Sequence, residues 1–268
     1  NMIIPYIMVH RHDSQNSIKT SVEVAGAENL VRRLRAEGYD SIGILHVIIA
    51  AYIRAISQRP GVNRFIRGQK IWARNGIVVN LVAKTKMKLD ADDTTLKMRF
   101  SPSDTILDVY EKFSEAYARV SEGGEGKGDK AARIICYIPG IFKKLAIGVL
   151  RGLDYFGLMP RAIVEASPFH GSLFITNMAS LNIPPIVHHL YNFGNVPVFI
   201  AFGAKRYEIV LDDEGNASKK RVIDFVANLD ERICDGYYYA SAMKLFLKYF
   251  KEPEELINPP ETVVEDIP

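Results

Sequence analysis

The sequence has little of several features that mark whole classes of protein. Its two cysteines, Cys136 and Cys234, lie far apart, which excludes a disulfide framework and indicates a reducing, cytoplasmic location. No basic-then-apolar signal opens the chain. The net charge is only +3 over 268 residues, with no block of five like charges, so nothing indicates nucleic-acid binding. No His-x-x-x-His spacing or carboxylate cluster indicates a metal site.

What is present is ordinary for a soluble globular protein, with 48% hydrophobic and 24% charged residues. Apolar periodicity predicts helices over 27–37, 41–56, 103–120 and 237–250. Alternating or continuous apolar runs predict strands over 94–100, 171–177, 196–203, 204–211 and 221–229. Asn75-Gly76 lies between two apolar runs and predicts a hairpin, Asp212 to Asn216 predicts a turn, and the tail from Pro253 is expected to run extended over the surface.

Two segments need separate interpretation. The glycine-rich stretch 123–130 lacks the strand and the Gly-Lys-Ser/Thr ending of a phosphate-binding loop, so we expect a surface loop. The segment Ile134 to Glu165 is long and apolar, but its charges exclude a membrane span. Its apolar residues Ile141, Leu145, Val149 and Phe156 share one helical face. We expect this face to be buried against protein, as a lid or a subunit contact, with a membrane surface as the alternative.

Near the C-terminus the chain reads D-E-R-I-C-D-G over residues 230–236, followed by an amphipathic stretch. This resembles the signature D-H-R-x-x-D-G of the superfamily that contains the chloramphenicol acetyltransferases and the acyltransferase component of 2-oxo acid dehydrogenase complexes. Glu231 stands where that signature has its catalytic histidine. A second stretch, G-S-L-F-I-T-N-M over residues 171–178, is similar to the G-T-F-T-I-S-N-L strand of the same superfamily.

The resemblance covers most of the chain and implies a fold and an assembly. It implies an α/β two-layer sandwich, a mixed β-sheet with helices on one side, as in chloramphenicol acetyltransferase. We expect residues 1–268 to form a single acyltransferase-like catalytic domain, without a lipoyl or subunit-binding domain. The resemblance also implies a homotrimer with active sites in channels between neighbouring subunits.

The resemblance assigns roles to four residues. Glu231 would be the base that takes a proton from the acyl acceptor or from coenzyme A, although a glutamate needs a raised pKa for that task. Thr176 would donate a hydrogen bond to the tetrahedral oxyanion, but threonine is also common in strands for its shape alone. Asp235 would form a structural ion pair with an arginine, for which Arg11 is a candidate. Gly236 would allow a tight turn into the last helix.

Three histidines are alternative bases if Glu231 is inactive. These are His170, His188 and His189, and each could instead be a histidine that only packs in the core or lies at the surface. Because successive side chains of an extended segment face opposite ways, at most one of His188 and His189 would face a substrate.

The function implied is transfer of an acyl group from a coenzyme A-type thioester to an unknown small-molecule acceptor, with no permanently bound cofactor. The alternative is a catalytically lapsed homologue that acts as a trimeric scaffold or ligand-binding module. A resemblance to condensation-type domains is weaker, because those domains need a His-His pair just before the signature and Leu229-Asp230 precedes Glu231 here.

Overall fold

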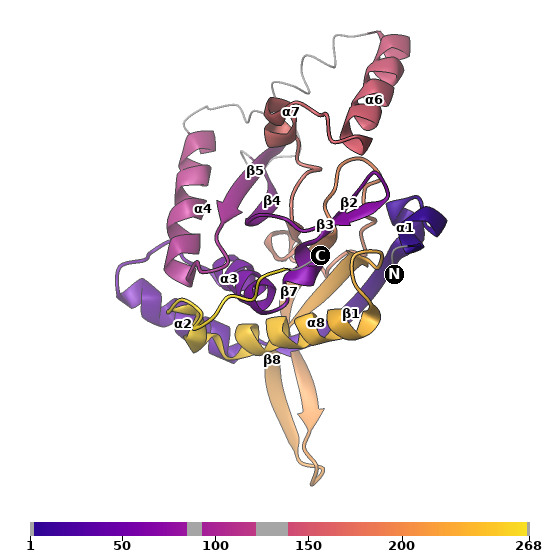
Figure 1. Ribbon diagram of the computed structural model, residues 1–268. Helices are drawn as coiled ribbons and strands as arrows, with labels where there is room; N and C mark the ends of the chain where they lie inside the picture. The colour runs from indigo at the N-terminus through magenta and orange to yellow at the C-terminus, as the bar shows by residue number, and fades with distance from the viewer. Residues whose placement is uncertain (1–2, 85–92, 122–138, 267–268) are drawn as a thin grey trace.

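The computed structural model describes residues 3–84, 93–121 and 139–266. Its centre is a six-stranded mixed sheet with the order β1-β8-β7-β6-β4-β5 (Figure 1). The strands are β1 (Gln15–Glu23), β4 (Ile77–Lys84), β5 (Asp93–Phe100), β6 (Leu173–Asn177), β7 (Val198–Leu211) and β8 (Ala217–Asp230). Strand β6 is parallel to both β4 and β7, and the remaining neighbours in the sheet are antiparallel.

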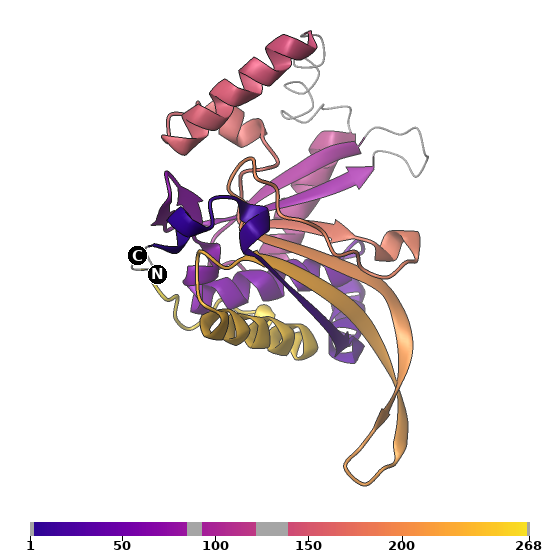
Figure 2. The ribbon, with the colours of Figure 1, turned by 90° about the vertical axis from the view of Figure 1, so that its right-hand side faces the viewer.

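Four long helices cover one face of this sheet (Figures 1 and 2). They are α2 (Ala25–Ala36), α3 (Ile44–Gln58), α4 (Ile106–Ser121) and α8 (Gly236–Lys251). Helix α3 is buried along most of its length, and Phe250 of α8 packs edge-on against Phe225 of the sheet. The predicted sandwich, with its helices on one side of a mixed sheet, is confirmed.

The opposite face of the sheet carries a smaller apolar cluster under the chain from 167 to 196. Its members are Phe174, Leu190, Val196, Phe199, Ala201 and Val226. The shorter elements are α1 (Ile4–Ile7), η1 (Arg11–Ser14), η2 (Pro60–Asn63), β2 (Phe65–Arg67), β3 (Lys70–Trp72), α6 (Gly140–Tyr155), α7 (Arg161–Ala166), η3 (Ala179–Leu181) and η4 (Pro253–Leu256).

The predicted hairpin at Asn75-Gly76 is wrong. Strand β3 pairs with β2, through a two-residue turn at Gly68 and Gln69, which have φ of 55° and 57°. Two successive left-handed residues are what a type I′ hairpin turn requires. Gly76, at φ 74°, instead lies in the turn that leads into β4, whose partners are β5 and β6.

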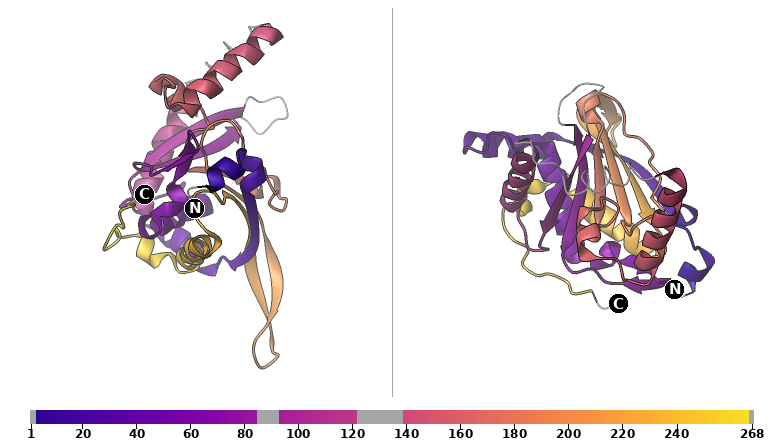
Figure 3. Two further views of the ribbon diagram at one scale, coloured as in Figure 1. Left: turned by 45° about the vertical axis from the view of Figure 1, so that its right-hand side comes forward. Right: turned by 90° about the horizontal axis from the view of Figure 1, so that it is seen from above.

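The two strands predicted over 196–211 are one strand, β7, with an irregularity between Phe202 and Lys205. Beyond this irregularity β7 and β8 continue as a two-stranded hairpin that extends past the rest of the molecule (Figures 2 and 3). Its turn lies where it was predicted, with the Asp212 N–H donating to the Asn216 carbonyl. Strand β1 was not predicted.

The tail expected to be extended from Pro253 begins instead with the short helix η4 (Pro253–Leu256), in which Pro253 and Leu256 are buried. Beyond it the chain runs over the surface, and the Val264 N–H donates to the Ser57 carbonyl at the end of α3. The glycine-rich stretch 123–130 and residues 134–138 lie outside the described residues. None of the residues of α6 is buried, so the expected burial of its apolar face is not met within the chain. Among the helices of the described ranges, none has the length and apolar character needed to cross a bilayer.

Candidate active site

The signature segment begins where β8 ends, and its first residue is the centre of a buried ion-pair cluster. Asp230 is 2% exposed. Its carboxylate accepts two hydrogen bonds from Arg232, from Nε and an Nη atom, both at 2.7 Å. Arg11 lies 3.5 Å from the same carboxylate, and the Ser14 hydroxyl donates to it at 3.0 Å. One buried carboxylate therefore compensates two buried guanidinium groups.

The two arginines connect this carboxylate to other parts of the chain. Arg11 donates to the backbone carbonyls of Tyr191 and Gly194. Arg232 donates to the carbonyls of Met8 and Val9 at 3.1 and 3.0 Å. Burial lowers the pKa of Arg11, and the neighbouring Asp230 acts against that shift. The cluster thus holds the N-terminal segment, the loop at 191–194 and the end of β8 together.

Glu231 follows directly on this cluster and is partly exposed. Its backbone N–H donates to the Ser14 carbonyl at 2.9 Å. One of its carboxylate oxygens accepts a hydrogen bond of 2.7 Å from the Asn16 side chain. The side chain predicted to be the base is therefore accessible, and edge strand β1, which sequence reasoning missed, positions it.

Asp235 has a different contact from the predicted one. It is the N-cap of α8, and its carboxylate accepts a hydrogen bond from the Tyr238 backbone N–H at 2.8 Å. Arg11, the proposed partner, pairs with Asp230 instead. Aspartate is one of the residues that commonly cap the N-terminus of a helix, so a backbone N–H of the first turn of α8 satisfies this carboxylate.

The role predicted for Gly236 is also wrong. It is the first residue of α8, its φ is not positive, and a Cβ built there would meet no atom within 4 Å. The turn into α8 therefore does not require glycine.

Thr176 lies on β6, far from Glu231 within one chain. Its hydroxyl is 3.7 Å from the Met178 sulfur, and its backbone is level with Ala201 and Val226 across β7 and β8. Glu231 is five residues further along the chain than Val226, directly after the end of β8, which is about 17 Å at the rise of a strand, and two strands away. A single chain does not bring these two predicted site residues together.

His170 is buried, and both of its ring nitrogens are occupied. Nδ1 lies 2.8 Å from the Ser167 hydroxyl, and Nε2 lies 3.2 Å from the Asp154 carboxylate on α6. This arrangement attaches α6 to the body of the protein and leaves His170 without a free nitrogen for catalysis.

His188 and His189 lie outside the sheet face that the helices cover. His188 stacks on Phe199, with ring centroids 4.1 Å apart, and on His189 at 4.6 Å. Partial burial lowers the pKa of His188, and the hydrogen bond to the His189 carbonyl acts against that shift. Its Nδ1 lies 2.7 Å from the His189 carbonyl, which leaves Nε2, 3.5 Å from the Tyr191 hydroxyl, as its accessible nitrogen.

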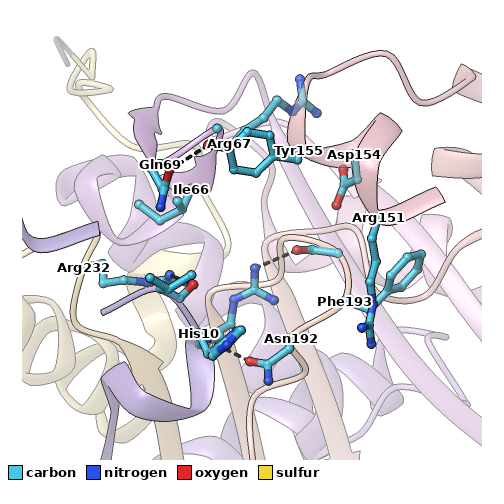
Figure 4. A pocket seen from close by; sticks show the side chains of 14 residues that line it. His10, Ile66, Arg67, Gln69, Arg151, Asp154, Tyr155, Asn192, Phe193 and Arg232 are labelled. Carbon is cyan, nitrogen blue, oxygen red and sulfur yellow. Dashed lines mark hydrogen bonds between the residues drawn. The ribbon is translucent and has the colours of Figure 1, made fainter. Parts of the chain in front are cut away.

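A cavity of about 270 Å³ adjoins the ion-pair cluster (Figure 4). It is lined by the segment 9–11, the β2–β3 hairpin, the C-terminal part of α6, the loop at 192–194 and Arg232. In Figure 4, Gln69 and Tyr155 lie at one end, joined by a hydrogen bond of 2.6 Å, and Arg151 extends beside Phe193. Sequence reasoning missed this cavity, because its walls come from segments far apart in the chain.

Within the described ranges, no group of three or more histidine, cysteine or acidic side chains is placed to hold a metal ion. Cys234 of the signature is partly buried, and this burial raises its pKa to about 12. Its thiol is therefore protonated and unsuited to nucleophilic attack.

No family model matches this chain, and no curated protein matches it by sequence. Solved structures do match. A probable dihydrolipoamide acetyltransferase from Listeria monocytogenes aligns over 95% of this chain and 94% of its own, with a TM-score of 0.61 and 13% identity. The chain has the fold of these acyltransferases.

Two further structures agree. The dihydrolipoamide acetyltransferase of Azotobacter vinelandii covers 95% of this chain with 90% of its own, at a TM-score of 0.62 and 10% identity. A chloramphenicol acetyltransferase covers 92% with 91% of its own, at a TM-score of 0.51 and 16% identity. The resemblance found in the two sequence motifs is thus confirmed at the level of the fold. At these identities the roles of individual residues stay predictions.

Proposed function

We propose that this protein transfers an acyl group from a coenzyme A-type thioester to a small-molecule acceptor, at sites formed between neighbouring copies of the chain. The observation that carries the proposal is the position of Glu231. It is an accessible carboxylate at the end of β8 in an acyltransferase fold, held by Asn16 and Ser14 beside a rigid ion-pair cluster.

The chemistry needs only groups that the chain supplies. The Glu231 carboxylate takes the proton of the acceptor hydroxyl or amine while the acceptor attacks the thioester carbonyl. The Thr176 hydroxyl of a neighbouring copy donates a hydrogen bond to the resulting oxyanion. When the tetrahedral intermediate collapses, the C–S bond breaks and the thiolate takes the proton back from Glu231.

A thiol-release assay with acetyl-coenzyme A and a panel of hydroxyl and amine acceptors tests this proposal. We expect slow turnover that Glu231→Gln lowers by about 10²–10⁴, the usual contribution of a general base. Thr176→Ala should lower it by about 10²–10³. Glu111→Gln, a change of an exposed glutamate on α4, is the matched control and should leave the rate unchanged.

The alternative is a lapsed acyltransferase that serves as a scaffold. The ion-pair cluster holds the shape of the signature segment whether or not chemistry occurs, so it is compatible with this alternative. In that case the native protein shows no turnover, and Glu231→His restores it. Native turnover that survives Glu231→Gln would contradict both versions and would direct attention to His188.

A further inference from the structure

Helix α6 presents an unusual apolar surface to solvent. Side chains along one side of it and just beyond its end are largely exposed: Ile141 is 77% exposed, Leu145 65%, Val149 55%, Phe142 59% and Phe156 73%. Soluble proteins rarely expose contiguous apolar patches of this kind without a binding role. The helix projects from one end of the protein (Figures 1 and 2).

Polar contacts of Asp154, on the opposite side of α6, and of Tyr155, beside the edge of the apolar side, attach the helix to the body and set its orientation. At 100° per residue, Asp154 lies opposite the line of Ile141, Leu145 and Val149. Asp154 pairs with the buried His170 at 3.2 Å, and the Tyr155 hydroxyl donates to Gln69 at 2.6 Å. Turning the apolar side inward would break both contacts.

Before Asp154, the charges along this helix have one sign. From Gly140 to Leu153 the sequence contains Lys143, Lys144 and Arg151 and no acidic residue. Lys144 lies about 100° from the line of Ile141, Leu145 and Val149, beside one edge of the apolar side, and Lys143 lies about 160° from it, on the side of Asp154. In the part of the chain that the structure describes, no ion pair is found for any of these three cations.

We propose that α6 binds the surface of an anionic lipid membrane, with its apolar side in the boundary between headgroups and acyl chains. An apolar side with cations on the polar remainder of the helix is the arrangement of interfacial helices, and the cations are attracted to the negative surface potential. At 16 residues α6 is about 24 Å long and lies on the membrane rather than across it. This proposal is independent of acyl transfer.

The position of α6 in the molecule allows this contact. It lies at one extreme of the protein, at the end opposite the β7–β8 hairpin (Figures 1 and 2). A flat surface can therefore reach the apolar side without meeting the sheet. A second copy of the chain would have to offer an apolar and acidic surface to match the same charges, so the charge pattern favours lipid.

Flotation of the full-length protein with phosphatidylcholine vesicles, with and without phosphatidylglycerol, tests the proposal at physiological salt. We expect flotation only with the anionic vesicles. Lys143→Glu with Lys144→Glu should lower the partition coefficient about thirtyfold or more, given the usual contribution of each cation. Phe142→Ser with Leu145→Ser should abolish flotation. Lys19→Glu with Lys244→Glu changes the net charge equally at exposed sites elsewhere and should have no effect.

Three results would overturn the proposal. One is the absence of flotation with anionic vesicles. Another is equal binding to neutral vesicles that the Lys143 and Lys144 changes do not reduce. The third is a native protein that binds no vesicles and forms an oligomer that the Phe142 and Leu145 changes dissociate. That result would assign the apolar surface to contact with a second copy. Circular dichroism and thermal melting of each variant distinguish loss of binding from loss of fold.

Discussion

At the scale of single residues, Asp230 stabilises the signature segment more than Glu231, which stands at the position of the signature histidine. It is the counter-charge of both Arg11 and Arg232, and all three side chains are at least 94% buried. Asp230→Asn would leave two buried guanidinium groups without compensation. We expect it to lower the free energy of unfolding by about 3–5 kcal/mol, measured by urea denaturation.

The matched control is Asp235→Ala. Asp235 caps α8 at the surface, so its loss should cost about 1 kcal/mol, the usual value for an N-cap. If the two substitutions had equal effects, the ion-pair cluster would not stabilise the fold as described. A loss below about 1 kcal/mol for Asp230→Asn would contradict it directly.

These two aspartates also show how far a motif reaches. The apolar patterns predicted a strand over 221–229 and a helix over 237–250, so the signature lies between them, as the end of β8 and the start of α8 confirm. The signature did not identify the partner of Arg11. Arg11 pairs with Asp230 because the N-terminal segment and the loop at 191–194 meet at the end of β8. A local sequence pattern does not predict such a contact.

At the scale of elements, the predicted helices with a strong apolar periodicity are correct, whereas the prediction of which β-strands pair in a hairpin is wrong. The amphipathic α2 ends as predicted before Gly38, which has φ of 105°. The Asn75-Gly76 hairpin failed because a turn signal specifies a reversal of the chain but not which strands then pair. Strand β1 was missed because it is an edge strand with a single buried residue, Val22, and lacks an apolar pattern.

The start of α3 carries a pH-dependent contact. The Gly43 N–H donates to Nδ1 of His46 at 3.0 Å, which satisfies one of the free donors at the start of the helix. Burial, together with Arg35, lowers the pKa of His46 from 6.5 to about 4. Between these two values the unfolded chain binds a proton that the folded chain does not, so stability falls as the pH falls.

We therefore expect the free energy of unfolding to fall by about 2–3 kcal/mol through His46 alone between pH 7 and pH 4.5. Urea denaturation of the native protein and of His46→Gln at both pH values isolates this contribution. Glutamine keeps an acceptor for the Gly43 N–H but does not titrate. Stability curves that stay parallel over this range would show that His46 does not carry the effect.

At the scale of the whole molecule, the separation of Thr176 and Glu231 decides the assembly that the proposed chemistry needs. Within one chain they lie about 17 Å apart along the strands, too far to act on one acyl group. A rotation that places the β6 end of one copy against the β8 end of the next would unite them, and repeating it closes a ring. Three such sites per ring are the assembly that the sequence resemblance implies.

We expect sedimentation at micromolar concentration to give three copies of the 30.1 kDa chain, about 90 kDa. A monomer would contradict this prediction.

Complementation tests the shared site itself. Chains carrying Glu231→Gln and chains carrying Thr176→Ala, unfolded together and refolded as a mixture, should regain turnover at about a quarter of their sites, because one interface in four then pairs a native Glu231 with a native Thr176. Each variant refolded alone should stay inactive. A mixture no more active than its parts would show that the two residues do not share a site, even if the protein is a trimer.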